Sequence, residues 1–287
     1  MPKKIWLLWL QGEQQAPPLV QHCLASWRQK NPKWQVIVLD HQSLKQFIQL
    51  QLPQPRFRRL TPQQQSDLIR LALLDQQGGV WADATTFCMI PLDQWLANVL
   101  DSGCFLFSRP GKDRLIASWF MAAIPNHYLI SCWHRFLSSY WLENSFEPLN
   151  FWQRQLASIL DLFLTANCQV TQYWFSRVIT KRLKVYPYYS LHYAFFYLVN
   201  NDPKANALWQ AMPRLSANPP LRLVRQNLFS KVTAATKAEL QGDPQPLYKL
   251  TWKHPKLAAY FANPSHYQDS VLHYLIQEFQ RQSIEKG

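Results

Sequence analysis

The sequence contains little glycine, few acidic residues and no long apolar run. Seven of its 287 residues are glycine, and 17 Asp or Glu stand against 30 Lys or Arg. The first apolar run, Ile5 to Leu10, is shorter than the hydrophobic region of a signal peptide, and no uninterrupted apolar stretch reaches membrane-crossing length. These absences argue against a secreted or membrane-spanning protein and favour a globular chain that is soluble or peripheral.

Cysteine and histidine are present without the spacing of disulfide frameworks or metal sites. The five cysteines form an odd set with no Cys-X-X-Cys pair, and no histidine pairs with a glutamate in the zinc-protease pattern. A chain without disulfides is typical of a reducing compartment. We therefore predict a cytoplasmic protein without a zinc site, and peripheral attachment at the inner face of the plasma membrane stays open.

Apolar residues are plentiful, at 48% of the chain, and their spacing indicates the fold class. Short apolar runs alternate with helical patterns, which predicts an α/β fold with a mostly parallel central sheet, helices on both faces and a helical, loop-rich C-terminal part. Strands are expected at residues 5–10, 35–39, 80–82, 104–107 and 118–123, helices at 17–29, 43–49, 128–141 and 151–175, and a surface loop at 51–59.

One further helix has the clearest boundaries in the chain. Thr61 is followed by Pro62, and Gln64 stands three residues after the threonine, which is the pattern of a capping box with proline at the first helical position. Gly78 and Gly79 supply the left-handed backbone that ends a helix. Because glycine is scarce in this chain, we predict that the pair is required at this position.

Three charged residues near this helix are candidates for chemistry. Asp67 and Arg70 stand three residues apart on one face of the helix, and Asp83 follows the predicted strand 80–82 at its carboxyl end. Open α/β sheets bind ligands at that edge, where a carboxylate can hold Mg²⁺ or Mn²⁺ at a leaving diphosphate. The structural alternative is equally open: Asp83 caps the next turn, and Asp67 and Arg70 neutralise each other.

The loop after the first predicted strand holds two more candidates. Gln11 and Gly12 follow the strand directly, and a glycine there lets backbone groups approach a nucleotide. We predict that they bind substrate, and a simple structural turn is the alternative.

Together these motifs resemble the signature of the capsular polysaccharide synthesis protein family, GT-A type glycosyltransferases related to enzymes with an Asp-X-Asp sugar-binding motif. The order that carries the resemblance is Ser66, Asp67, Arg70, Gly78, Gly79, Trp81, Asp83, Ala84 and Thr85. The opening segment at residues 3–40 and the blocks SWFMAAIPNH, YYSLHYAFFYLVNNDP, LWQAMPRLSANPP and PLYKLTWK are similar to further family blocks. The resemblance therefore covers residues 3–255.

The resemblance implies a GT-A-like fold, a nucleotide-diphosphosugar donor and a reaction that retains the anomeric configuration. Carried over by position, Asp83 corresponds to the first aspartate of Asp-X-Asp, as a catalytic residue and metal ligand, and Asp67 is a second catalytic residue at the donor. The other positions that would bind substrate are Arg70, Gly79, Ala84 and Thr85.

The implied metal site has one carboxylate, because Thr85 stands where the wider group has its second aspartate. One carboxylate is a weak site for a divalent metal without help. His192, in the aromatic stretch YPYYSLHYAFFY, is the candidate substrate-binding residue and second metal ligand, since imidazole suits Mn²⁺ better than Mg²⁺. The alternative for His192 is a hydrogen-bonded core or stacking residue.

Positive charge gathers in the C-terminal third, where residues 177–256 hold 13 Lys or Arg and 3 Asp or Glu. It fits a donor diphosphate, an anionic membrane surface with a lipid-linked acceptor, nucleic acid, or simply a solvated face. No nucleic-acid-binding motif accompanies it, so we predict no nucleic-acid partner. Interleaved aromatic residues favour a membrane-proximal or glycan-facing surface, and core packing is the alternative for each single one. They are Trp174, Phe175, Tyr186, Tyr188, Tyr189, Trp209 and Trp252.

For domain organisation we predict a single GT-A-like domain at residues 1–255, with a nucleotide-sugar-binding core at 1–125, an acceptor-side part at 126–255 and a helical tail at 256–287. The predicted activity is transfer of a sugar from a nucleotide-diphosphosugar donor to a surface or capsular polysaccharide or its lipid-linked precursor. The alternative is a non-catalytic glycan- or membrane-binding scaffold on a decayed GT-A fold.

Overall fold

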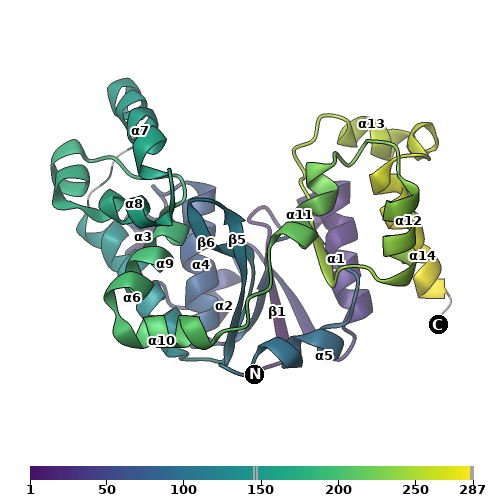
Figure 1. Cartoon of the computed structure of the whole chain (residues 1–287), viewed down its shortest axis with the longest axis horizontal. Coiled ribbons are helices and arrows are strands. Elements are labelled where there is room, and N and C mark those ends of the chain that lie inside the picture. Colours follow the sequence, from purple (N-terminus) through teal and green to yellow (C-terminus); the bar gives the residue numbers. More distant parts are fainter. Residues whose placement is uncertain (145, 147, 285–287) are drawn as a thin grey trace. The chain divides into compact units, whose positions relative to one another are not determined.

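The computed structural model describes residues 1–144, 146 and 148–284 (Figure 1). Its strands form a five-stranded sheet in the order β2-β1-β3-β6-β5 and a two-stranded sheet of β4 and β7. The bounds are β1 Lys4–Leu8, β2 Gln35–Leu39, β3 Gly79–Ala82, β4 Thr86–Cys88, β5 Cys104–Gly111, β6 Arg114–Ala123 and β7 Leu247–Lys249. The α/β class is confirmed.

The five-stranded sheet is mixed, and whether most of its pairings are parallel stays a prediction. β1 and β2 are parallel, whereas β5 and β6 are antiparallel. Only Lys112 and Asp113 connect β5 to β6, and a connection of two residues can join only antiparallel neighbours, because a parallel crossover needs a dozen or more residues. The predicted strands at 104–107 and 118–123 are both present, and both are longer than expected.

The chain folds into two compact units built from interleaved segments. The first unit comprises Met1–Pro2, Leu44–Trp81 and Leu100–Ser216, and the second comprises Lys3–Ser43, Ala82–Val99 and the chain from Ala217 onward. Each unit therefore takes residues from both sides of position 125, where the sequence suggested a division. The functional meaning of the division at 125 stays a prediction.

Helices make up most of the first unit. Helix α4 packs against α6, α6 against α9, and α9 against β6. Trp133 of α6 is fully buried, and its indole N–H donates to the Leu191 carbonyl at 3.0 Å. The bounds are α2 Leu44–Phe47, α3 Gln54–Phe57, α4 Pro62–Gln76, α6 Tyr128–Glu143, α7 Phe151–Leu164, α8 Cys168–Thr171, α9 Ser190–Asn201 and α10 Pro203–Ala211. The single turn α3 lies in the segment predicted as loop, because Pro55 in its first turn is compatible with a helix start.

The predicted boundaries of α4 are confirmed. The Thr61 hydroxyl accepts from the Gln64 backbone N–H at 3.3 Å, and the Gln64 side chain accepts from the Thr61 N–H at 2.9 Å. Beyond the helix, Gly78 has φ +64°, and a Cβ there would lie 2.7 Å from two ring atoms of Pro125. Glycine is therefore required at position 78 both for its backbone angle and for the space beside it.

The second unit is organised around α1 and β4. The Trp27 indole N–H donates to the Thr86 carbonyl at 2.8 Å, and the Ser26 hydroxyl accepts from the Cys88 N–H at 2.9 Å. The antiparallel ladder pairs Thr86 with Lys249. The bounds are α1 Pro18–Lys30, α5 Leu92–Trp95, α11 Asn218–Arg225, α12 Ala234–Gly242, α13 Leu257–Ala262 and α14 Val271–Ile284.

The C-terminal segment predicted as a helical tail is helical and belongs to the core of the second unit. Val271, Leu272 and Leu275 of α14 are buried in one apolar cluster with Phe87 and Tyr248. Residues 285–287 of the predicted tail lie outside the described residues. Among the helices that the structure describes, none combines the length and the apolar character needed to cross a membrane.

Candidate functional site

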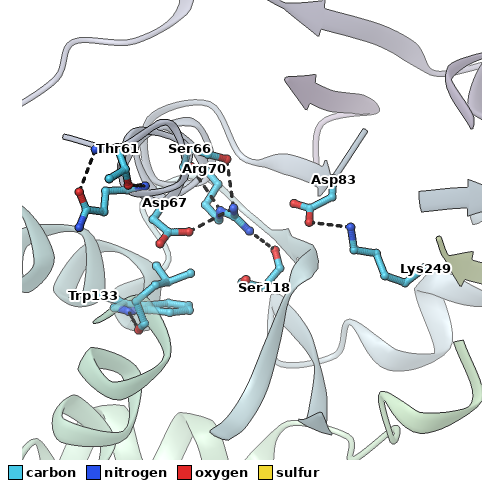
Figure 2. A network of polar contacts seen from close by, with 10 residues as sticks. Thr61, Ser66, Asp67, Arg70, Asp83, Ser118, Trp133 and Lys249 are labelled. Carbon is cyan, nitrogen blue, oxygen red and sulfur yellow. Dashed lines mark hydrogen bonds and ion pairs between the residues drawn. The ribbon is translucent and has the colours of Figure 1, made fainter. Parts of the chain in front are cut away.

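Two polar clusters contain the charged residues singled out in the sequence (Figure 2). The Asp67 cluster lies in the first unit and consists of Ser66, Asp67, Arg70, Trp81 and Ser118. The Asp83 cluster lies in the second unit and consists of Asp83, Thr85 and Lys249.

The Asp67 cluster is a buried ion pair on α4. Asp67 Oδ1 lies 3.1 Å from an Arg70 terminal nitrogen, and the two side chains are 4% and 6% exposed. The three-residue spacing places both on one face of the helix, and that face is buried inside the protein. Charges so far from water are tolerated because each has the other as partner.

Arg70 makes further contacts that tie α4 to the sheet. Its guanidinium donates to the Ser118 carbonyl of β6 at 2.6 Å and to the Ser66 hydroxyl at 3.0 Å. It also lies over the Trp81 ring of β3, 5.0 Å from the ring centre. Figure 2 shows the guanidinium between the Asp67 carboxylate and Ser118. These contacts agree with the alternative in which Asp67 and Arg70 neutralise each other inside the fold. A role of the pair in orienting a donor stays a prediction.

The Asp83 cluster is more accessible. Asp83 directly follows β3, and its carbonyl accepts from the Thr86 N–H at 2.8 Å, which closes a turn. Lys249 Nζ lies 3.0 Å from Asp83 Oδ2, and the two side chains are 19% and 27% exposed. The same ammonium donates to the Thr85 hydroxyl. A carboxylate, an ammonium and a hydroxyl thus meet at one place that solvent still reaches.

The backbone around the cluster explains why Lys249 lies there. The β4–β7 ladder places Lys249 opposite Thr86, and the Leu250 N–H donates to the Thr85 carbonyl at 2.8 Å. The positive charge of Lys249 also acts on the core of this unit. Burial raises the pKa of Cys23 to about 12, and the charge of Lys249 opposes that rise.

Lys249 was not among the residues predicted from the sequence. Its block, PLYKLTWK, carries part of the family resemblance, so the signal was present without an assigned role. Thr85 and Lys249 are 164 residues apart in the chain. Only the strand pairing of β4 with β7 brings them together.

The predicted loop residues Gln11 and Gly12 belong to the second unit. Gly12 has φ +93°, its N–H donates to the Trp9 carbonyl at 2.9 Å, and its carbonyl accepts from Gln15 at 3.1 Å. These bonds are those of a turn, and Gln11 is exposed beside it. Trp9 meets the half-exposed Trp252 edge to face, with ring centres 5.5 Å apart. Because Trp252 follows β7 closely, the same unit presents an aromatic surface beside its charged cluster.

The remaining predicted residues are buried. Ala84, next to Asp83, is 6% exposed, and Gly79 is buried with φ +96°. His192 on α9 is 8% exposed, and its ring meets Tyr189 edge to face at 5.4 Å. These surroundings agree with the alternative in which His192 is a core or stacking residue. Its roles as a substrate-binding residue and as a metal ligand stay predictions.

The described side chains form no metal site of their own at Asp83, and the metal role of Asp83 stays a prediction. Among them, no group of three or more His, Cys, Asp or Glu side chains lies close enough to hold an ion. The Asp83 carboxylate is instead paired with the Lys249 ammonium. A site with one carboxylate, already neutralised by a lysine, offers a hard cation too few oxygen ligands.

A family model described as "Capsular polysaccharide synthesis protein" matches residues 1–181. One curated relative is glycosyltransferase afumC of Aspergillus fumigatus, which is 30% identical in an alignment that covers 48% of this chain and 40% of the relative. A second is O-glycosyltransferase braB of Annulohypoxylon truncatum, which is 26% identical in an alignment that covers 48% of this chain and 38% of the relative. The chain thus spans about two fifths of the length of these relatives. A solved structure titled "PaToxG Glycosyltransferase" matches 98% of this chain and 87% of that chain, with 14% identity and a TM-score of 0.40.

Proposed function

Because the chain belongs to the capsular polysaccharide synthesis protein family, we propose that it is a GT-A-like glycosyltransferase. It transfers a sugar from a nucleotide-diphosphosugar donor to a surface polysaccharide or its lipid-linked precursor, with retention of configuration. The names of the relatives afumC and braB support the reaction class. The single observation that carries the proposal is the Asp83 cluster, a solvent-reachable ammonium held by a carboxylate directly after a sheet strand.

The chemistry of the reaction explains why such a cluster is useful. The bond between the sugar's anomeric carbon and the β-phosphate oxygen breaks, and the acceptor hydroxyl oxygen bonds to that carbon. The departing diphosphate gains negative charge as its bond breaks, and the acceptor's proton passes to a phosphate oxygen. A cation aimed at that charge stabilises the transition state more than the ground state.

In this proposal Lys249 supplies the cation. Its ammonium has three N–H donors, of which Asp83 and Thr85 engage two at most. The diphosphate takes the remaining donor and shares the ammonium with Asp83, so Asp83 positions the lysine. Gly12 and Trp252 would meet the nucleotide, since an exposed aromatic ring can stack on a base. Asp67, Arg70 and His192 stay proposed donor-binding residues, and Asp67→Asn tests the first of them.

The test is thermal stabilisation of the purified protein by nucleoside diphosphates, with Mg²⁺, with Mn²⁺ and with chelator, because selective binding to the folded state raises its stability. We expect one nucleoside diphosphate to stabilise the protein even with chelator present. Lys249→Ala should abolish the shift and Lys249→Arg should keep part of it. Lys256→Ala, at an exposed lysine of the same unit, is the matched control and should respond like the unsubstituted protein.

Two results would contradict the proposal in different ways. A thermal shift that requires Mn²⁺ or Mg²⁺ and persists in Lys249→Ala would mean that a metal ion, and not Lys249, stabilises the charge of the diphosphate. A folded protein that responds to no nucleoside diphosphate would favour the second candidate, a non-catalytic scaffold on the same fold. The observation behind that candidate is the single carboxylate at the predicted sugar-binding motif.

A further inference from the structure

Helix α7 of the first unit exposes an unusual set of large apolar side chains. Five of them have exposed fractions from 54% to 77%: Phe151, Trp152, Ile159, Leu162 and Phe163. None of the fourteen residues of α7 is buried. Soluble proteins rarely leave large apolar side chains contiguous on their surface, and such a patch marks an interaction site. Figure 1 shows α7 at one end of its unit.

The exposed side chains form one stripe on the helix. At about 100° per residue, Trp152, Ile159 and Phe163 fall within about 40° of one another, and Phe151 and Leu162 lie together on one side of them. Another face of α7 is already used: Leu156, Leu160 and Leu164 pack against the cluster around Trp174 and Ile179. The helix is therefore anchored to its unit through one face, and the exposed stripe borders that face.

Basic residues lie beside this helix. The π-helical segment η4 spans Val178–Leu183, and the Gln153 side chain of α7 donates to the Leu183 and Lys184 carbonyls at 3.5 and 3.4 Å. Residues 150–185 contain five Lys or Arg and one Asp or Glu, a balance of +4. Four of these basic residues are exposed next to one another in the chain: Arg177, Lys181, Arg182 and Lys184.

We propose that α7 and this basic segment form a docking surface for an anionic lipid bilayer. The helix lies in the plane of the membrane, with Trp152, Ile159 and Phe163 at the boundary of headgroups and acyl chains. Arg182 and Lys184 contact the anionic headgroups. An apolar stripe beside a positive segment complements a membrane with negative charge at its surface and apolar chains beneath it, whereas a second copy would bring like charges together.

The surface differs from the one predicted from the sequence. Trp174 and Trp209, expected at a membrane-proximal or glycan-facing surface, are 0% and 6% exposed and belong to the core. Of the same expected set, Tyr188 and Trp252 do face solvent, at 63% and 43% exposed. The stripe on α7 lies before the basic third, in a helix for which no membrane role was predicted. The proposal does not rest on the transferase activity, because lipid binding needs neither donor nor acceptor.

The experiment is sedimentation of the purified full chain with vesicles of phosphatidylcholine alone and of phosphatidylcholine mixed with phosphatidylglycerol. We expect binding to the mixed vesicles, weakened by salt because charges contribute. Trp152→Gln combined with Phe163→Gln should lower the partition coefficient by on the order of tenfold or more, through lost apolar burial. Arg182→Gln combined with Lys184→Gln should lower it for the mixed vesicles only.

Matched controls use exposed residues of the same unit elsewhere. Leu215→Gln removes an exposed apolar side chain, and Lys45→Gln combined with Arg58→Gln removes two exposed charges; both should bind like the unsubstituted protein. Thermal unfolding without vesicles checks that every variant is folded.

Three outcomes would overturn the proposal. The first is no binding to mixed vesicles by the folded chain. The second is binding that the α7 substitutions leave unchanged. The third is a concentration-dependent dimer, without vesicle binding, that the α7 substitutions abolish, which would assign the stripe to a second copy.

Discussion

The two aspartates that the sequence singled out lie in opposite environments. The Asp67 side chain is 4% exposed and paired with a 6% exposed arginine, whereas the Asp83 side chain is 27% exposed and paired with a 19% exposed lysine. Arg70 also contacts a backbone carbonyl of β6 and the Trp81 ring of β3, while the Lys249 ammonium contacts the side chains of Asp83 and Thr85. The two carboxylates of one motif therefore differ in their surroundings: Asp67 is paired inside the fold, and Asp83 is paired where solvent reaches it.

Burial decides the energetic difference. Breaking a buried ion pair leaves an unpaired charge away from water, which costs about 3–5 kcal/mol, whereas a partly exposed pair contributes roughly 1 kcal/mol or less. Substitutions in the two clusters should therefore differ in their effect on stability.

The largest effect on stability is expected for Asp67→Ala. The free energy of unfolding should fall by about 3–5 kcal/mol, because Arg70 is left buried without its partner. The double variant Asp67→Ala with Arg70→Met should lose less than the sum of the two single losses, since it removes both charges. Urea unfolding measures both. A loss below about 1 kcal/mol would mean that the pair is not structural.

The Asp67 cluster can also be tested for donor binding. Asp67→Asn keeps the shape of the side chain and removes its charge. If the variant folds and still responds to nucleoside diphosphate, the pair acts only on stability. If it folds and no longer responds, the difference between the two aspartates disappears and Asp67 belongs to the donor site.

For Lys249→Ala we expect the reverse pattern. The rate of sugar transfer should fall roughly a hundredfold to a thousandfold, the usual effect of removing one group that stabilises developing charge. Stability should change by about 1 kcal/mol or less. The rate is measured with the donor whose nucleotide stabilises the protein, and Lys256→Ala serves as the control. Equal rates for the two variants would remove Lys249 from the reaction.

Gly78→Ala tests the turn that precedes β3 and Asp83. We expect a loss of about 1–3 kcal/mol, because an alanine at φ +64° is strained and its Cβ would approach Pro125 to 2.7 Å. Gly242→Ala is the control, since a Cβ there meets nothing within 4 Å. Thermal unfolding of both variants gives the comparison, and equal midpoints would show that the turn relaxes without cost.

The smallest effect concerns acid stability, through a third carboxylate in the first unit. Burial by itself raises the pKa of Asp75. Hydrogen bonds from His134 and Ser131 together lower it by more than burial raises it, so the pKa lies below its ordinary value. His134 Nδ1 lies 2.9 Å from the Asp75 carboxylate.

A carboxyl whose folded-state pKa is lowered stabilises the fold above its ordinary pKa and loses that contribution as the pH falls through the lowered value. Unfolding midpoints in urea should therefore decline as the pH drops from neutral to below the ordinary range of Asp, about 3.9. Asp75→Asn should flatten this decline. An unchanged pH profile in the variant would assign the acid sensitivity to other carboxyl groups.

Local sequence signals predicted much of the fold. The capping box at Thr61, the glycine at position 78 and the strand at 35–39 all form as expected, because each depends on residues a few positions apart. The antiparallel pairing of β5 with β6 was missed, since the boundaries of both strands were drawn too short to reveal their tight connection.

The sequence alone was therefore enough to predict the class of the fold, the start and end of α4, and the residues on which the family resemblance rests. The burial of Asp67, the pairing of Lys249 with Asp83 and the solvent exposure of the apolar stripe of α7 became visible in the folded structure. The reason is physical. Backbone conformation responds to near neighbours, whereas the charge partner and the solvent exposure of a side chain depend on elements far away in the chain that fold against it.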